Sequence, residues 1–190
     1  MKLKIQNQWA LWGLTLFLVL MLPLPAVCQK ASIKEVDVKG SNGGWKISFN
    51  VDNCFTERMK EAIQTGIRTT FTFYLNLYQK RSWWKDRKMA SVEFRHTIQY
   101  DPMRGEYHLT IEESHSSLVT SNFEEAKRLM ATVKEVEIRP SPSHHPRIPS
   151  YLRVKGELDP VRLPFHLEYL FFFVSLWDFE TDWHMEPLLP

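Results

Sequence analysis

Residues 70–78 read TFTFYLNLY, and this stretch decides the fold class. Phe71, Phe73, Leu75 and Leu77 alternate with residues of higher polarity. A period of two is typical of a β-strand with one face on a hydrophobic core and the other face outside it. Such alternation is commonest in antiparallel sheets. We therefore expect an antiparallel β domain built outward from this strand.

Two further strands follow and complete a meander. Residues 92–100 repeat the alternation, and His96 shares the inward-pointing face with Phe94. The sequence DPMRG at 101–105 contains the Asp, Pro and Gly that tight turns favour, and it leads into a third strand at 107–111. We expect these strands to pair in sequence order.

The remaining segments predict more strands and a few short helices. Strands are expected at 33–38, 45–51, 133–138 and 151–158. The sequence GSNGG between the first two of these is typical of a hairpin turn. Residues 139–150, RPSPSHHPRIPS, form a loop because proline cannot donate to a strand ladder.

Helices are expected at three places. Residues 55–66 form an amphipathic helix that begins with a cap at Thr56 and ends at Gly66. Ser121 and Glu124 have the spacing of a capping box that opens a second helix. A third begins near Pro164. The predicted fold is α+β, mostly antiparallel β, with a sandwich-like sheet and two or three short helices.

The N-terminus predicts export. Residues 1–28 combine two early lysines, the apolar run ALWGLTLFLVLML and the sequence PLPAVC, which together are typical of a signal peptide. We expect cleavage after Cys28, which leaves a single β-rich domain over 30–190 in the periplasm or outside the cell. Two alternatives stay open, namely an uncleaved inner-membrane anchor over residues 10–28 and an acylated Cys28.

Charge and cysteine content narrow the function. The chain has 24 Lys and Arg against 22 Asp and Glu, and removal of Lys2 and Lys4 makes these numbers equal. A neutral domain has no basic face for nucleic acid, so no nucleic-acid partner is expected. Cleavage also leaves Cys54 as the one cysteine, which excludes an internal disulfide. We expect Cys54 to be a small buried residue.

Catalytic and metal-binding patterns are weak. Three serines surround His115, but the segment lacks a nucleophile elbow and is interpreted as a polar loop. His144 and His145 are adjacent and would point to opposite sides of an extended chain. Spacing by two would place Asp178, Glu180, Asp182 and His184 on one face of a strand, which we interpret as a solvated face. We expect no enzyme activity, no cofactor and no metal site.

Aromatic residues give the best candidate site. Trp83 and Trp84 lie in a charged hairpin beside Arg81, Lys85 and Arg87. Aromatic and basic side chains together suit a partner surface or the membrane interface. The alternative is that one tryptophan folds back over the sheet edge while lysine side chains cover the other. The apolar run at 170–177 is instead expected in the core, because it has no polar side.

Four stretches carry a resemblance to a known family: GIRTTFTFYLNLYQKRSWWKDRK, YDPMRGEYHLT, LDPVRLPFHLEYLFFF and WDFETDW. In their order along the chain they resemble a family of exported proteobacterial proteins, domain of unknown function 4390. The resemblance covers essentially the whole chain after the signal. The resemblance implies no defined activity. In relatives, the gene often lies beside that of a membrane sensor kinase, so the resemblance implies an accessory role beside such a kinase.

The expected function is an exported, non-catalytic binding module at the outer face of the inner membrane. Its partner would be a membrane protein or the membrane surface. A periplasmic carrier of an apolar ligand is the first alternative, and it predicts a large cavity lined by Phe71, Phe73, Phe94 and Phe171. An uncharacterised hydrolase is the second, and it predicts a cleft in which His and carboxylate side chains converge.

Overall fold

The computed structural model of the chain describes residues 30–41, 43–145, 147–159 and 179–188. The expected export signal, the expected third helix and the apolar run at 170–177, which includes Phe171, lie outside these residues. Within them, no helix is long and apolar enough to cross a membrane.

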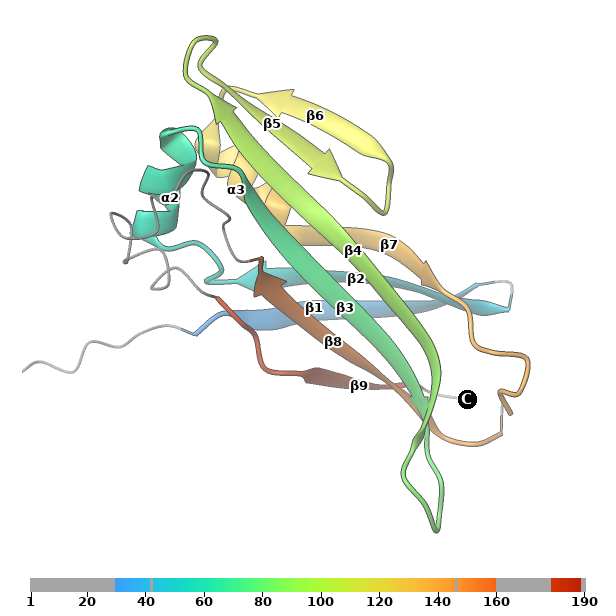
Figure 1. The fold of residues 1–190 in the computed structure, drawn as a ribbon. Coiled ribbons are helices and arrows are strands. Elements are labelled where there is room, and N and C mark those ends of the chain that lie inside the picture. Colours follow the sequence, from blue (N-terminus) through green and yellow to red (C-terminus); the bar gives the residue numbers. More distant parts are fainter. Residues whose placement is uncertain (1–29, 42, 146, 160–178, 189–190) are drawn as a thin grey trace, which may run out of the picture.

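The described strands form two antiparallel sheets that make a sandwich (Figure 1). Their bounds are β1 Ser32–Ser41, β2 Gly44–Asp52, β3 Thr69–Gln79, β4 Arg87–Asp101, β5 Glu106–Ile111, β6 Ser116–Thr120, β7 Thr132–Ile138, β8 Ser150–Leu158 and β9 His184–Leu188. The larger sheet has the order β6-β5-β4-β3-β8-β9, and the smaller has the order β1-β2-β7. This arrangement confirms the predicted α+β fold and the meander of β3, β4 and β5.

The stretch TFTFYLNLY is the central part of β3. Phe71, Phe73, Leu75 and Leu77 are fully buried. The strand pairs with β4 on one side and β8 on the other. Its Phe73 ring lies edge-on, 5.7 Å from the ring of Phe49 in the smaller sheet. Burial of each such side chain contributes about 1.5–3 kcal/mol, so this strand holds the two sheets together.

The two described helices confirm one cap and correct the other. In α2, Glu57–Gln64, the Thr56 hydroxyl accepts a hydrogen bond from the amide of Met59 at 3.2 Å, and Gly66 follows with φ of +89°. In α3, Phe123–Ala131, the cap is Asn122 and not Ser121. The Asn122 side chain accepts from two amides of the first turn at 2.9 and 3.3 Å. Ser121 lies one residue too early to reach them.

Strand β6 was not predicted, because its segment was interpreted as a polar loop. It pairs with β5 along its whole length at the edge of the larger sheet. Leu118 and Val119 are neighbours and both are exposed, so the strand has no buried face and no alternation. An edge strand of this kind gives no periodic signal in the sequence.

The longest strand, β4, runs the length of the molecule and joins two turns at its ends (Figure 1). It pairs with β5 only from His96 to Asp101, so that its first part has β3 as its one strand partner among the described residues. The hairpin between β3 and β4 therefore projects beyond the body of the sandwich, at the lower end of Figure 1.

Candidate functional site

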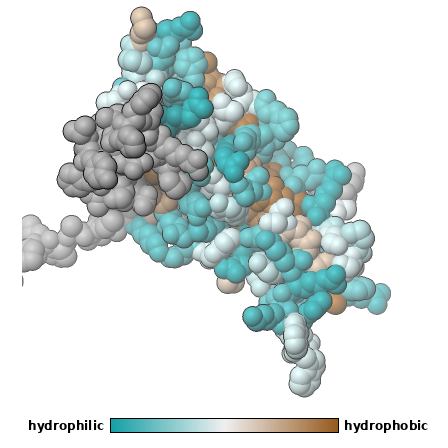
Figure 2. All heavy atoms as spheres, in the orientation of Figure 1, coloured by the Kyte–Doolittle hydropathy of each residue, from teal (hydrophilic) through white to brown (hydrophobic). Residues whose placement is uncertain are grey.

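The projecting hairpin carries the predicted site residues. We name residues 80–88 the Trp hairpin. Trp83 is 96% exposed and Trp84 is 78% exposed, so neither folds back over the sheet edge. In Figure 2 the hairpin is the lowest part of the described surface, with a pale tip and hydrophilic side chains above it. Two large apolar side chains thus lie in solvent at the end of a hairpin.

The Trp hairpin is strongly basic. Its cations are Lys80, Arg81, Lys85, Arg87 and Lys88. None of them, and not Arg153 in β8 either, forms an ion pair with any residue that the structure describes. The structure thus brings all three predicted cations, at positions 81, 85 and 87, beside the two tryptophans.

The acid of the hairpin, Asp86, is occupied within the protein. Its carboxylate accepts hydrogen bonds from the amide of Arg81 at 3.1 Å and from the hydroxyl of Tyr151 at 2.8 Å. Burial and this bond to Asp86 raise the pKa of Tyr151. The carboxylate shapes the turn. With five cations and this one acid, the hairpin has a formal charge of 5 − 1 = +4.

The proline-rich loop between β7 and β8 supports the base of the hairpin. The amide of Lys80 donates to the carbonyl of Pro149 at 2.9 Å, and the Gln79 side chain donates to the carbonyl of His145 at 2.8 Å. On the other strand the amide of Ser141 donates to the carbonyl of Met89 at 3.0 Å. These bonds hold the hairpin in one direction relative to the sandwich.

The adjacent histidines of this loop have different surroundings. His144 packs edge-on against Trp45 at 5.5 Å, and its Nε2 lies 3.3 Å from the hydroxyl of Ser150. Burial, with a smaller effect of His145, lowers the pKa of His144. His145 is exposed. Across the described part of the chain, no group of three or more His, Cys, Asp or Glu is arranged to hold a metal ion.

Beside the hairpin, the outer face of the larger sheet carries aligned aromatic and basic side chains. We call the side of β3, β4, β8 and β9 that is turned away from the core the outer face. Tyr78 and Tyr151 are directly opposite each other there, and their rings stack at 5.5 Å and 14°. In the next row Arg153 lies between Asn76 and Met185. The outer face is thus continuous with the Trp hairpin.

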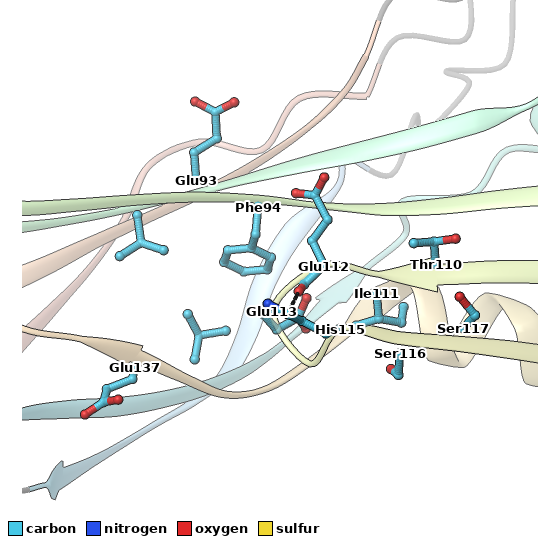
Figure 3. Close-up of a pocket in the computed structure, with 12 residues that line it drawn as sticks. Glu93, Phe94, Thr110, Ile111, Glu112, Glu113, His115, Ser116, Ser117 and Glu137 are labelled. Atoms are coloured by element: carbon cyan, nitrogen blue, oxygen red, sulfur yellow. Dashed lines mark hydrogen bonds between the residues drawn. The ribbon is translucent and has the colours of Figure 1, made fainter.

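A separate cleft of about 710 Å³ opens beside the turn from β5 to β6 (Figure 3). Its glutamates are engaged by neighbours. The amide of Arg95 donates to Glu112 at 2.9 Å, and the Arg139 guanidinium lies 2.9 Å from Glu137. In Figure 3 the carboxylates of Glu93 and Glu137 point away from Phe94 in the middle. These carboxylates do not converge on one point in the cleft.

A buried histidine lies behind that cleft. His96 is fully buried, with Nδ1 2.9 Å from the carbonyl of Met130 and Nε2 2.9 Å from a carboxylate oxygen of Glu113. A carbonyl oxygen only accepts, so Nδ1 carries a proton. A second proton must then lie between Nε2 and the Glu113 carboxylate. The pair connects β4, α3 and the β5–β6 turn, and it has the geometry of a structural link.

The other polar candidates stay apart from one another. His115 Nδ1 lies 2.7 Å from the carbonyl of Glu112 in its own turn, and the hydroxyls of Ser114 and Ser116 lie 2.6 Å from each other. Cys54 is buried as expected, and its thiol donates to the carbonyl of Val51 at 3.4 Å. Burial raises the pKa of Cys54 to about 12.

The acidic tail does not form a single face. Strand β9 begins only at His184, which is opposite the inward-facing Val154, whereas Glu180 is opposite Glu157 on the outer face. Glu180 pairs with Lys155 at 2.7 Å, and Asp182 pairs with Lys30 at 2.7 Å. Asp178 lies outside the described residues. The expected common face is therefore wrong, because the chain becomes a regular strand too late.

Comparison with known proteins identifies the family. A family model described as "Domain of unknown function (DUF4390)" matches residues 28–186. The chain belongs to this family. No curated protein and no solved structure gives a significant match. Membership confirms the resemblance drawn from the sequence, and it assigns no activity to the DUF4390 domain.

Sequence reasoning missed the outer face of this DUF4390 domain. Tyr78, Tyr151 and Arg153 come from segments far apart in the chain, and the strand register brings them together. Trp183, just before β9, joins them by stacking on Arg153. A signal did exist, because Tyr78 and Tyr151 put large aromatic rings at positions of their strands that do not face the core.

Proposed function

We propose that the protein is an exported, non-catalytic binding module that docks through the Trp hairpin at the outer face of the inner membrane. There it would present its outer face to a membrane-protein partner, for which the family resemblance suggests a sensor kinase. The observation that carries the proposal is the exposure of Trp83 and Trp84 at a projecting tip with one acid and five cations, none of which forms an ion pair with a described residue.

The chemistry of the tip fits an anionic membrane surface. Tryptophan is enriched where headgroups meet hydrocarbon, because its ring is apolar and its N–H is polar. Each Lys or Arg near an anionic surface contributes about 1 kcal/mol. The hairpin therefore combines apolar insertion with charge attraction, and the bonds at its base keep the tip directed outward.

Neither alternative has comparable support. The phenylalanines assigned to a carrier cavity pack against other rings, with Phe71 4.6 Å from Phe179 and Phe73 5.4 Å from Phe94. In the cleft that a hydrolase would use, the carboxylates bond to neighbouring backbone and side-chain groups and do not meet at one point.

Vesicle co-sedimentation tests the proposal. The purified protein is mixed with vesicles of phosphatidylethanolamine and phosphatidylglycerol, or with vesicles of phosphatidylcholine alone. Binding to the anionic vesicles is expected, with loss in the variant W83A/W84A. Lys85→Glu should cost roughly 2 kcal/mol of binding free energy, about thirtyfold, because it removes one attraction and adds one repulsion.

Met103 supplies the matched control. It is as exposed as Trp83, at 96%, but it lies in the turn at the other end of β4. Met103→Ala should bind vesicles like the wild type. The tryptophan variant should also keep its unfolding free energy within about 0.5 kcal/mol, as surface changes usually do. Equal vesicle binding by the wild type, W83A/W84A and Lys85→Glu would contradict docking through the Trp hairpin.

A further inference from the structure

Arg153 is the unusual charge on the outer face. Its guanidinium carbon lies 4.6 Å from the centre of the Trp183 ring and 5.9 Å from that of Tyr78. Its Nε is buried and has no hydrogen-bond partner among the described residues. A buried donor without a partner is costly, so such groups in folded proteins call for an explanation. Stacking on the ring orients the guanidinium plane, and no described carboxylate forms an ion pair with the guanidinium.

The neighbouring charges on the same face are satisfied. Lys155, one position along the outer face of β8, lies 2.8 Å from Glu157 and 2.7 Å from Glu180. The hydroxyl of Tyr74 donates to Glu157 at 2.8 Å. Both carboxylates are thus engaged by Lys155 and lie on its side of the row. Arg153, by contrast, forms no ion pair with a described residue.

The geometry points to Arg153 as the binding site for a carboxylate side chain of a protein partner. A stacked guanidinium that no described carboxylate engages suits bidentate bonds to a carboxylate through its terminal nitrogens. The rim consists of Tyr78, Tyr151, Trp183 and Met185, and Tyr, Trp, Met and Arg are the residues enriched at the centres of protein interfaces. An acidic side chain beside an apolar or aromatic group would fill this site.

Lipid phosphate carries similar oxygens, but distance disfavours it. Arg153 is opposite Asn76, seven residues before Trp83 along β3 and its hairpin. At about 3.3 Å per residue for extended chain this places Arg153 at most roughly 23 Å from the tip. A headgroup layer is about 5–8 Å thick on each side of the hydrocarbon. When the tip meets the membrane, Arg153 thus lies above the lipids, where a membrane protein's outer part would be.

This inference rests on the proposed binding function, and only its preference for a protein carboxylate over a lipid phosphate uses the membrane docking step. The test follows the Nε–H signal of Arg153 by NMR in isotope-labelled protein, assigned by its absence in Arg153→Lys. A short oligoglutamate peptide is titrated in, with sodium chloride of equal ionic strength as the blank and inorganic phosphate as the competitor. A saturable shift with oligoglutamate is expected, and a much smaller one with phosphate.

Variants make the outcome decisive. Arg153→Lys keeps the charge and stem but lacks the fork, and it should bind oligoglutamate about tenfold more weakly. Arg104→Gln, in the turn at the far end of β4, should bind like the wild type. Unchanged affinity in Arg153→Lys, or an Nε–H signal that oligoglutamate does not move, would overturn the assignment. Equal shifts with phosphate would overturn the choice of a carboxylate.

The two proposals fail separately in these experiments. If the docking proposal is wrong, vesicle binding will not depend on Trp83 and Trp84, while oligoglutamate will still shift the Arg153 signal. If the Arg153 proposal is wrong, oligoglutamate will not move the Nε–H signal, while the protein will still sediment with anionic vesicles.

Discussion

At the scale of single residues, buried polar groups show what the fold depends on. His96 was expected to point inward, and it does so with both ring nitrogens engaged. Its partner Glu113 is almost buried, with 9% of the side chain exposed. The sequence could predict the direction of the His96 side chain from its alternation with Phe94, but Glu113 comes from a turn whose position depends on the unpredicted strand β6.

Removal of the Glu113 carboxylate should be costly. Glu113→Ala leaves Nε2 of a buried histidine without a partner, and a buried polar group left unsatisfied costs about 1–3 kcal/mol. Glu113→Gln should cost much less, because its amide can donate to a neutral His96 ring. Urea unfolding of the two variants measures the difference. Similar destabilisation by both would mean that the carboxylate charge, rather than the hydrogen bond, is what His96 needs.

The Cys54 thiol should be unreactive in the folded protein. Burial raises its pKa to about 12, so that at pH 8 almost none of it is the reactive thiolate. The variant Cys28→Ser, which leaves Cys54 as the one cysteine, should label with a maleimide only as fast as the protein unfolds. Labelling rates measured across a urea series check this. Rapid labelling without urea would show that the thiol is accessible to solvent.

At the scale of elements, local signals predicted helices and hairpins better than strand partners. The turns before β2 and β5 and the helix α2 were predicted because glycine, proline and a capping threonine act within a few residues. The pairing of β8 with β3 was not, since it joins segments about eighty residues apart, and many registers satisfy the same alternation. The outer face was missed for the same reason.

The structure shows which of two adjacent residues, Ser121 or Asn122, caps α3, and the sequence alone did not decide this. Asn122→Ala should destabilise the protein by about 1 kcal/mol, because two amides of the first turn lose their acceptor. Ser121→Ala should be close to neutral, since its hydroxyl makes neither bond. Thermal unfolding of both variants gives the comparison. Greater destabilisation by Ser121→Ala than by Asn122→Ala would mean that Ser121 is the cap.

At the scale of the whole molecule, stability in alkaline solution should reflect the seam between β3 and β8. Burial and the hydrogen bond to Glu157 raise the pKa of Tyr74 to about 12, from an ordinary value near 10. A raised pKa in the folded state gives a contribution that is complete below pH 10 and is lost as the pH rises toward 12. Urea unfolding of the wild type should therefore show decreasing stability across this range.

Tyr74→Phe isolates that effect from the other groups that titrate at high pH. The phenylalanine variant should lose stability less steeply between pH 10 and 12, and the difference between the two curves belongs to Tyr74. Parallel curves would show that Tyr74 titrates alike in the folded and unfolded chains.

The length of β4 gives the molecule a further property, that of a spacer. The strand has 15 residues and carries the Trp hairpin at one end and the turn with Met103 at the other. At about 3.3 Å per residue it holds these two ends up to roughly 50 Å apart. Because a paired strand within a sheet cannot shorten, docking of one end would set the height of the other above the membrane. A partner that contacts the upper turn would then have to reach a fixed height above the membrane.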